Sequence, residues 1–197
     1  MKERPILFSG PMVRAILNGS KTQTRRIVKP QPYAPGYKAI DLPPDCHITD
    51  LNDMKIKCPY GQPGDRLWVR ETIKANPSDI YYAADEKTIE YDNDSQPEFF
   101  DSYGSDQKEE VTIPSIHIPR WASRITLEIV NIRVERLNEI SEEDAKAEGV
   151  SYTKDEFEKH RWCFKDEFEK LWESIHGPGS WKKNPWVWVI GFRRVKP

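Results

Sequence analysis

A ten-residue run of strand-forming residues, ITLEIVNIRV at 125–134, constrains the fold more than any other segment. Six of its ten residues are β-branched, and such side chains pack well on a pleated sheet. The run is also longer than a typical strand, so we expect a central strand here. A second run, PWVWVIGF at 185–192, predicts the closing strand of the chain.

Shorter signals predict the other elements of the fold. Pro11 is a favourable first helical residue, and Gly19 can end the helix that it starts. Ser141, with an acidic residue three positions later, is a capping signal, and Gly149 is the matching stop. We therefore expect helices at 11–18, 142–148 and 155–176 and strands at 22–28 and 66–71. Short helices among several strands predict an α+β domain around a small barrel-like sheet.

Two stretches interrupt this pattern. Residues 29–65 hold seven prolines, which is typical of an extended loop. Residues 77–118 are polar and acidic, and they predict at most one short strand, at 80–83. We expect one domain over 1–197 that carries inserted loops at 30–60 and 73–118.

Composition limits the class of protein. No apolar run approaches the roughly 18 residues of a membrane span, and the first residues lack a signal peptide's apolar core. Three cysteines, Cys46, Cys58 and Cys163, are an odd number for a disulfide framework, so we expect a cytoplasmic protein. The cysteine and histidine spacings match no common zinc module, so we expect no metal and no cofactor.

Charge is distributed unevenly along the chain. The formal net charge is -2, but residues 1–30 carry seven Lys/Arg against one Glu, while residues 85–110 carry ten Asp/Glu against two Lys. This division indicates a polar or anionic ligand near the basic segment and a solvated acidic insertion. Charges that only decorate the surface are the alternative interpretation.

The segment GSKTQTRR at 19–26 concentrates side chains that could carry chemistry. In the expected strand, Thr24 and Arg26 share one face. A threonine hydroxyl needs a base to become a nucleophile, and Lys21 could act as one if burial or the cations Arg25 and Arg26 lower its pKa. An ordinary surface strand that carries Thr and Arg is the alternative.

Gly19, Lys21, Thr24 and Arg26 resemble the signature of the ASCH family, a Gly-x-Lys pair followed by a polar residue and an Arg. The resemblance implies a PUA-like β-barrel with short helices. The local match is similar to small bacterial ASCH amidohydrolases that deacylate N(4)-acetylcytidine with a Lys, a Thr and a distant Glu. Lys21 and Thr24 then carry over directly, and Glu148 is the counterpart of the Glu.

The resemblance covers about 5–28, 61–72 and 122–195 of the chain. The whole chain is similar to longer ASCH proteins of phages and prophages through two segments, PRWASR at 119–124 and NPWVWV at 184–189. It implies that Thr24 attacks an amide carbonyl and that Lys21 takes its proton. Glu148 would orient Lys21 or pass a proton to the leaving amine, unless it is only an exposed helix residue.

A second cluster could bind the substrate. Arg120 and Arg124 flank Trp121, and an aromatic ring between arginines suits stacking on a base. Packing of Trp121 under the insertion, with the arginines paired to its acids, is equally compatible with the sequence. We also assign Arg70 and Glu71 to the border of the site. The expected substrate-binding set is thus Arg26, Arg70, Glu71, Arg120, Trp121 and Arg124.

These motifs predict a nucleoside or nucleotide ligand, with RNA as a further candidate partner and no membrane. The leading hypothesis is an amidohydrolase, and the alternatives are a non-catalytic module for RNA or a modified nucleotide, or a ribonuclease. A sequence pI near 6.1 favours a small ligand over a long phosphate backbone. The sequence predicts no oligomeric state.

Overall fold

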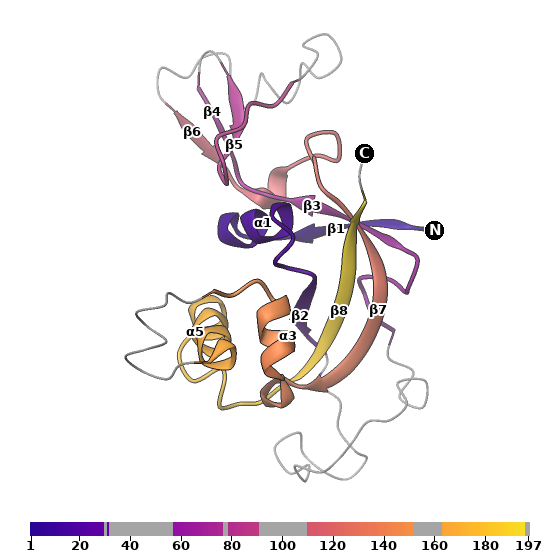
Figure 1. Ribbon diagram of the computed structural model, residues 1–197. Helices are drawn as coiled ribbons and strands as arrows, with labels where there is room; N and C mark the ends of the chain where they lie inside the picture. Colours follow the sequence, from indigo (N-terminus) through magenta and orange to yellow (C-terminus); the bar gives the residue numbers. More distant parts are fainter. Residues whose placement is uncertain (30, 32–56, 77–78, 91–109, 152–162, 196–197) are drawn as a thin grey trace.

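The computed structural model describes residues 1–29, 31, 57–76, 79–90, 110–151 and 163–195. A five-stranded sheet forms its frame (Figure 1), in the order β1 (Glu3–Leu7), β3 (Arg66–Arg70), β7 (Thr126–Arg136), β8 (Trp186–Val195) and β2 (Gln23–Ile27). β1 and β3 are parallel, and the other neighbours are antiparallel. The predicted α+β class and the four predicted main strands are confirmed.

β7 and β8 form the long curved pair at the centre of the sheet (Figure 1). Their register shifts between Ile129 and Asn131, so Val130 is left in a bulge. A bulge bends its strand and increases the local twist. Trp188 and Ile190 lie in one hydrophobic cluster, whereas the alternating valines of β8 lie in another, so β8 is buried on both faces.

The expected barrel is wrong for the part of the chain that the structure describes. There β1 pairs only with β3, and β2 pairs only with β8, so the sheet stays open. Closure would require hydrogen bonds between the two edge strands. The helix α1 (Gly10–Leu17) instead follows β1 and packs Val13 and Ile16 against the sheet.

In Figure 1, α3 and α5 lie side by side, with α3 nearer the β7–β8 pair, and α1 lies above them next to β1 and β3. Ser141 accepts a hydrogen bond from the Asp144 N–H, which confirms the predicted cap of α3 (Glu142–Ala147). α5 (Phe164–His176) packs Phe168 and Trp172 into its cluster, as its apolar spacing predicted. The predicted start of this helix, at 155, lies outside the described residues. The described residues also include two short 3-10 turns, η1 (Ser115–His117) and η2 (Leu137–Glu139).

A second, three-stranded sheet occupies the described part of 73–118, where we expected a loop with at most one strand. Its strands lie in the order β5 (Ile80–Tyr82), β4 (Ile73–Ala75) and β6 (Val111–Ile113). Ile73, Ile80 and Ile113 are the centre of a separate hydrophobic cluster, against which Trp121 packs. This part of the predicted insertion therefore has its own packed core. Most of the acidic stretch, 91–109, lies outside the described residues.

The helices described here include none that is long and apolar enough to cross a membrane.

Candidate active site

The backbone of Lys21 is docked on the end of α3. α1 ends at Leu17, and Gly19 turns the chain with a φ of 83°. The Lys21 N–H then donates to the Ala15 carbonyl at 2.9 Å, and Lys21 forms a β-bridge with Glu148. Residues 127 positions apart in the sequence are thus held side by side by the main chain.

Lys21 and Glu148 form a buried ion pair. The Lys21 Nζ donates to Glu148 Oε2 at 2.8 Å and to the Glu148 carbonyl oxygen at 2.8 Å. The side chain of Lys21 is 0% exposed and that of Glu148 is 3% exposed. Two buried charges require good geometry and further hydrogen bonds to offset their desolvation. The exposed helix position considered for Glu148 is therefore wrong.

Gly149 makes this close approach possible. Its φ is 81°, in the left-handed region that only glycine adopts at little cost. A Cβ placed on Gly149 would lie 2.8 Å from the Lys21 Cβ and 2.9 Å from the Ala15 Cβ. Glycine is therefore required here both by the backbone angle and by the lack of space.

Arg25 joins the ion pair to two further carboxylates. Its Nη1 donates to Glu148 Oε1 at 3.0 Å, its Nη2 to Asp144 Oδ2 at 2.8 Å and its Nε to Glu135 Oε1 at 3.1 Å. Arg133 bonds Glu135 and Asp144 from the outer side. Each of these three carboxylates consequently has at least one cationic partner.

The electrostatics favour the release of a proton from Lys21. Burial lowers the pKa of the Lys21 ammonium below its usual value, the charges of Arg26 and Arg25 act in the same direction, and Glu148 opposes them. A lysine with a lowered pKa holds a free amine more readily near neutral pH and can act as a base.

Neither Thr24 nor Arg26 is hydrogen-bonded to this pair in the described part of the chain, and only Arg26 shares a neighbour, Phe8, with Lys21. Thr24 is buried in β2 opposite Ile190, and the structure shows no hydrogen bond from its hydroxyl to Lys21 or Glu148 among the described residues. Arg26 donates to the Leu7 carbonyl at 2.6 Å. Its guanidinium and the Lys21 Nζ lie 5.3 and 5.7 Å from the same Phe8 ring centroid.

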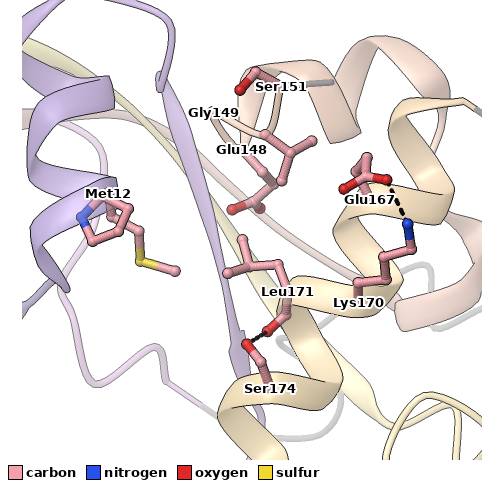
Figure 2. A pocket seen from close by; sticks show the side chains of 10 residues that line it. Met12, Glu148, Gly149, Ser151, Glu167, Lys170, Leu171 and Ser174 are labelled. Carbon is pink, nitrogen blue, oxygen red and sulfur yellow. Dashed lines mark hydrogen bonds and ion pairs between the residues drawn. The ribbon is translucent and has the colours of Figure 1, made fainter. Parts of the chain in front are cut away.

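A cavity of about 370 Å³ opens next to Glu148, between α1, the end of α3 and α5, and Lys21, Thr24 and Arg26 are not among its lining residues. Figure 2 shows the Glu148 carboxylate between Met12 of α1 and Leu171 of α5. Ser151 and Ser174 add hydroxyl groups to a mainly apolar lining. The volume falls within the roughly 300–1,000 Å³ of small-molecule sites, which combine apolar walls with a few polar groups.

Three of the predicted substrate-binding residues make contacts within the chain away from this cavity. Arg70 donates to the Ile116 carbonyl at 3.0 Å and lies 4.8 Å from the Trp68 ring centroid. Arg120 pairs with Glu3 at 3.1 Å. Trp121 packs on the cluster of the three-stranded sheet. None of these three lines the cavity beside Glu148.

Glu71 and Arg124 form a second ion pair, at the three-stranded sheet. Arg124 donates to both Glu71 carboxylate oxygens, at 3.0 and 2.9 Å, and it also pairs with Asp85. Its guanidinium lies 3.8 Å from the Tyr82 ring centroid. Burial raises the pKa of the Glu71 carboxyl, although Arg124 opposes the change. The pairing with Asp85 matches the packing alternative for this arginine, and neither residue lines the cavity beside Glu148.

The sequence interpretation used Arg25 only as a cation near Lys21, and it gave Glu135 and Asp144 no place in the site. The alternation along β2 held the signal, because Gln23 and Arg25 follow Lys21 at every second position and all three are buried. The prediction from the sequence instead placed the reactive groups on the other face of the strand, which carries Thr24.

Within the described ranges, no group of three His, Cys, Asp or Glu side chains could hold a metal ion. Cys46, His47 and His160 lie outside those ranges. Cys58 and Cys163 are free thiols, and burial raises the pKa of each.

Comparison with known proteins gives one distant likeness. No protein-family model and no curated protein matches the chain. Among solved structures, the chain is similar to the crystal structure of a protein from Enterococcus faecalis V583, described under the family model DUF984. The identity is 10%, 99% of this chain and 81% of that chain are covered, and the TM-score is 0.42. A likeness at this level carries no argument about this chain's function.

Proposed function

We propose that the protein is an amidohydrolase of the ASCH type that removes the acyl group from an N(4)-acylated cytidine-like nucleoside or base. The observation that carries the proposal is the buried Lys21–Glu148 pair, whose carboxylate lines a cavity of ligand size. The motif residues Gly19, Thr24 and Arg26 support it by their resemblance to the family signature.

In the proposed reaction, the Thr24 hydroxyl attacks the amide carbonyl carbon while the free amine of Lys21 takes its proton. The C–N bond then breaks, the proton passes to the leaving amine of the cytosine ring, and an acyl-threonine ester remains. Water attacks this ester, again with Lys21 as the base, and releases the carboxylic acid. Glu148 orients Lys21 throughout, and Arg26 stabilises the negative oxygen of each tetrahedral intermediate. Substrate binding must bring the Lys21 amine within hydrogen-bond distance of Thr24.

A spectrophotometric turnover assay on N(4)-acetylcytidine tests the proposal. Lys21→Ala should abolish measurable turnover, since a positioned base contributes about 10²–10⁴-fold. Arg25 still neutralises Glu148 in this variant, so the fold should survive. Lys74→Ala is the matched control, because Lys74 forms an exposed ion pair with Glu110 on the three-stranded sheet.

Three outcomes separate the candidate functions. Turnover that is lost in Lys21→Ala and Thr24→Ala but kept in Lys74→Ala would support the hydrolase. Full activity of Thr24→Ala would eliminate Thr24 as the nucleophile. A wild-type protein without turnover, but with salt-sensitive RNA binding, would refute the hydrolase in favour of a binding module.

A further inference from the structure

The two oxygens of the Glu148 carboxylate are held by different cations. Oε2 accepts from the Lys21 Nζ at 2.8 Å, and Oε1 accepts from the Arg25 Nη1 at 3.0 Å. The side chain of Arg25 is 0% exposed. Because each cation has its own oxygen, either one can change without displacing the other.

These two cations differ in their ability to lose a proton. A guanidinium stays protonated in proteins, whereas a buried lysine can become neutral. With Arg25 in place, Glu148 keeps a charged partner when Lys21 is neutral. Without Arg25, a neutral Lys21 would leave the buried Glu148 carboxylate without a cationic partner, which is strongly unfavourable. The proton would then stay on Lys21.

We propose that Arg25 is a positioning residue: it holds Glu148 as a carboxylate through Oε1 and thereby frees Lys21 to give up and accept a proton. The role concerns the base of the amidohydrolase and so rests on the proposed function. Arg25 itself has no contact with the cavity, and it acts through Glu148.

The surroundings of Arg25 fit this role. Glu135 of β7 and Asp144 of α3 accept its remaining N–H groups, and the Phe168 ring of α5 lies 5.8 Å from the guanidinium. Arg133 pairs with the same two carboxylates, which keeps them from competing for Lys21.

The other charged groups near Lys21 are few among the described residues. Arg26 of β2 acts on its pKa together with Arg25 and Glu148. From α5, Glu167 and Lys170 line the cavity and pair with each other at 2.7 Å. Arg14 of α1 is turned to the Ala84 carbonyl. Within this set, Glu148 therefore acts most strongly on the pKa of Lys21, followed by Arg26 and Arg25.

The test measures the titration of Lys21 directly, by NMR of protein carrying ¹³C at the lysine ε-carbon. The Lys21 signal is the one that is absent from Lys21→Ala. In the double variant Arg25→Met/Glu135→Gln, one cation and one of its carboxylates are removed together. We expect the Lys21 midpoint to rise by about one pH unit, the lower end of the effect of a close charge. Arg25→Gln/Glu135→Gln is a second version in case the first does not fold.

Two controls separate positioning from structural support. Glu135→Gln alone keeps Arg25, and Arg133→Gln removes a cation that touches the same network but not Glu148. Both should leave the Lys21 midpoint near its wild-type value. Arg25→Lys retains a positive charge, and its midpoint should lie below that of the double variants.

Each outcome distinguishes this role from the proposed function. An equal Lys21 midpoint in the wild type and a folded double variant would overturn the role of Arg25, whether or not the protein hydrolyses amides. A raised Lys21 midpoint in the double variant, combined with a wild-type protein that shows no turnover, would support the role of Arg25 and refute the hydrolase. If the role of Arg25 and the hydrolase are both correct, the acid limb of the kcat/KM profile of the double variant should move to higher pH together with the Lys21 midpoint measured by NMR.

Discussion

Replacement of Gly149 by alanine tests whether the close packing around Lys21 is as tight as the structure indicates. The added Cβ would lie 2.8 Å from the Lys21 Cβ and 2.9 Å from the Ala15 Cβ, and real Cβ atoms essentially never approach so closely. Both neighbouring atoms are attached directly to main chain that is hydrogen-bonded in place, through the Lys21 N–H and the Ala15 carbonyl. The strain therefore cannot be relieved by the rotation of a flexible side-chain end.

The expected loss of stability has two parts. A left-handed backbone angle costs a non-glycine residue about 1–2 kcal/mol. Overpacking of a well-filled site adds about 1–3 kcal/mol. Gly149→Ala should therefore lower the free energy of unfolding by about 2–5 kcal/mol.

Gly19→Ala is a matched control for the backbone part. Its φ of 83° is close to the 81° of Gly149, but a Cβ on Gly19 would meet no atom within 4 Å. This variant should lose only about 1–2 kcal/mol. Urea unfolding of both variants, compared at the midpoint with a common slope, measures the difference. Equal losses would refute the claim that Lys21 leaves no room at Gly149.

Three further predictions concern charge and pH. Glu148→Gln should reduce turnover of N(4)-acetylcytidine by at least about tenfold, because loss of an acid–base group reduces the rate by roughly a hundredfold or more. Unchanged turnover in this variant would show that Glu148 takes no part in the reaction. Burial raises the pKa of Tyr82 from 10.0 to about 12. Tyr82 therefore ionises at a lower pH in the unfolded chain than in the folded protein, so the free energy of unfolding should fall as the pH rises from 10 to 12. Tyr82→Phe should make this fall smaller, as measured by urea unfolding. Hydrogen bonds, first that from the Lys2 N–H, lower the pKa of the Asp65 carboxyl below 3.8. The ionised Asp65 carboxylate therefore contributes its full stability above pH 3.8, and this contribution is lost as the pH falls. Asp65→Asn should make the melting temperature, measured by circular dichroism, less dependent on pH in acid. An unchanged dependence would contradict this role of Asp65.

The main strands and helices could be predicted because their signals are local. The ends of α3 are marked by the Ser141 cap and by Gly149, and the apolar spacing of α5 is visible within the helix itself. The three-stranded sheet could not be predicted in the same way. β4 and β6 are three residues long, and their pairing joins residues about 38 positions apart, as between Ile73 and Ile113 (40 positions) and Ala75 and Val111 (36 positions). Such short strands carry no alternation that distinguishes them from a polar loop.

The open sheet has a related cause. A strand pattern indicates how many strands a chain can form, but closure depends on whether its two edge strands meet. Here β1 and β2 are separated in the sheet by three other strands, while α1 connects them in the chain. Neither fact can be read from alternation or β-propensity.

The candidate site shows the same division between local and non-local information. No spacing rule brings Lys21 to Glu148 across 127 residues; the pairing came from the resemblance to a family. The contacts of Arg70 and Arg120 were equally hidden, because the Ile116 carbonyl and Glu3 lie far from them in the sequence. Arg25 was within reach of the sequence, since the alternation from Lys21 marks it as a residue of the same buried row.

The balance of charge in the site limits the chemistry that it can support. The carboxylates of Glu135, Asp144 and Glu148 are matched by Lys21, Arg25 and Arg133, so this cluster is neutral when Lys21 is protonated. Arg26 lies beside it with a buried Nε that has no hydrogen-bond partner among the described residues, and its charge makes the site positive. In the proposed reaction, a proton that moves from the Thr24 hydroxyl to a neutral Lys21 adds a further positive charge to the site as negative charge appears on the attacked carbonyl oxygen. The arrangement therefore stabilises an oxyanion and disfavours a transition state that develops positive charge.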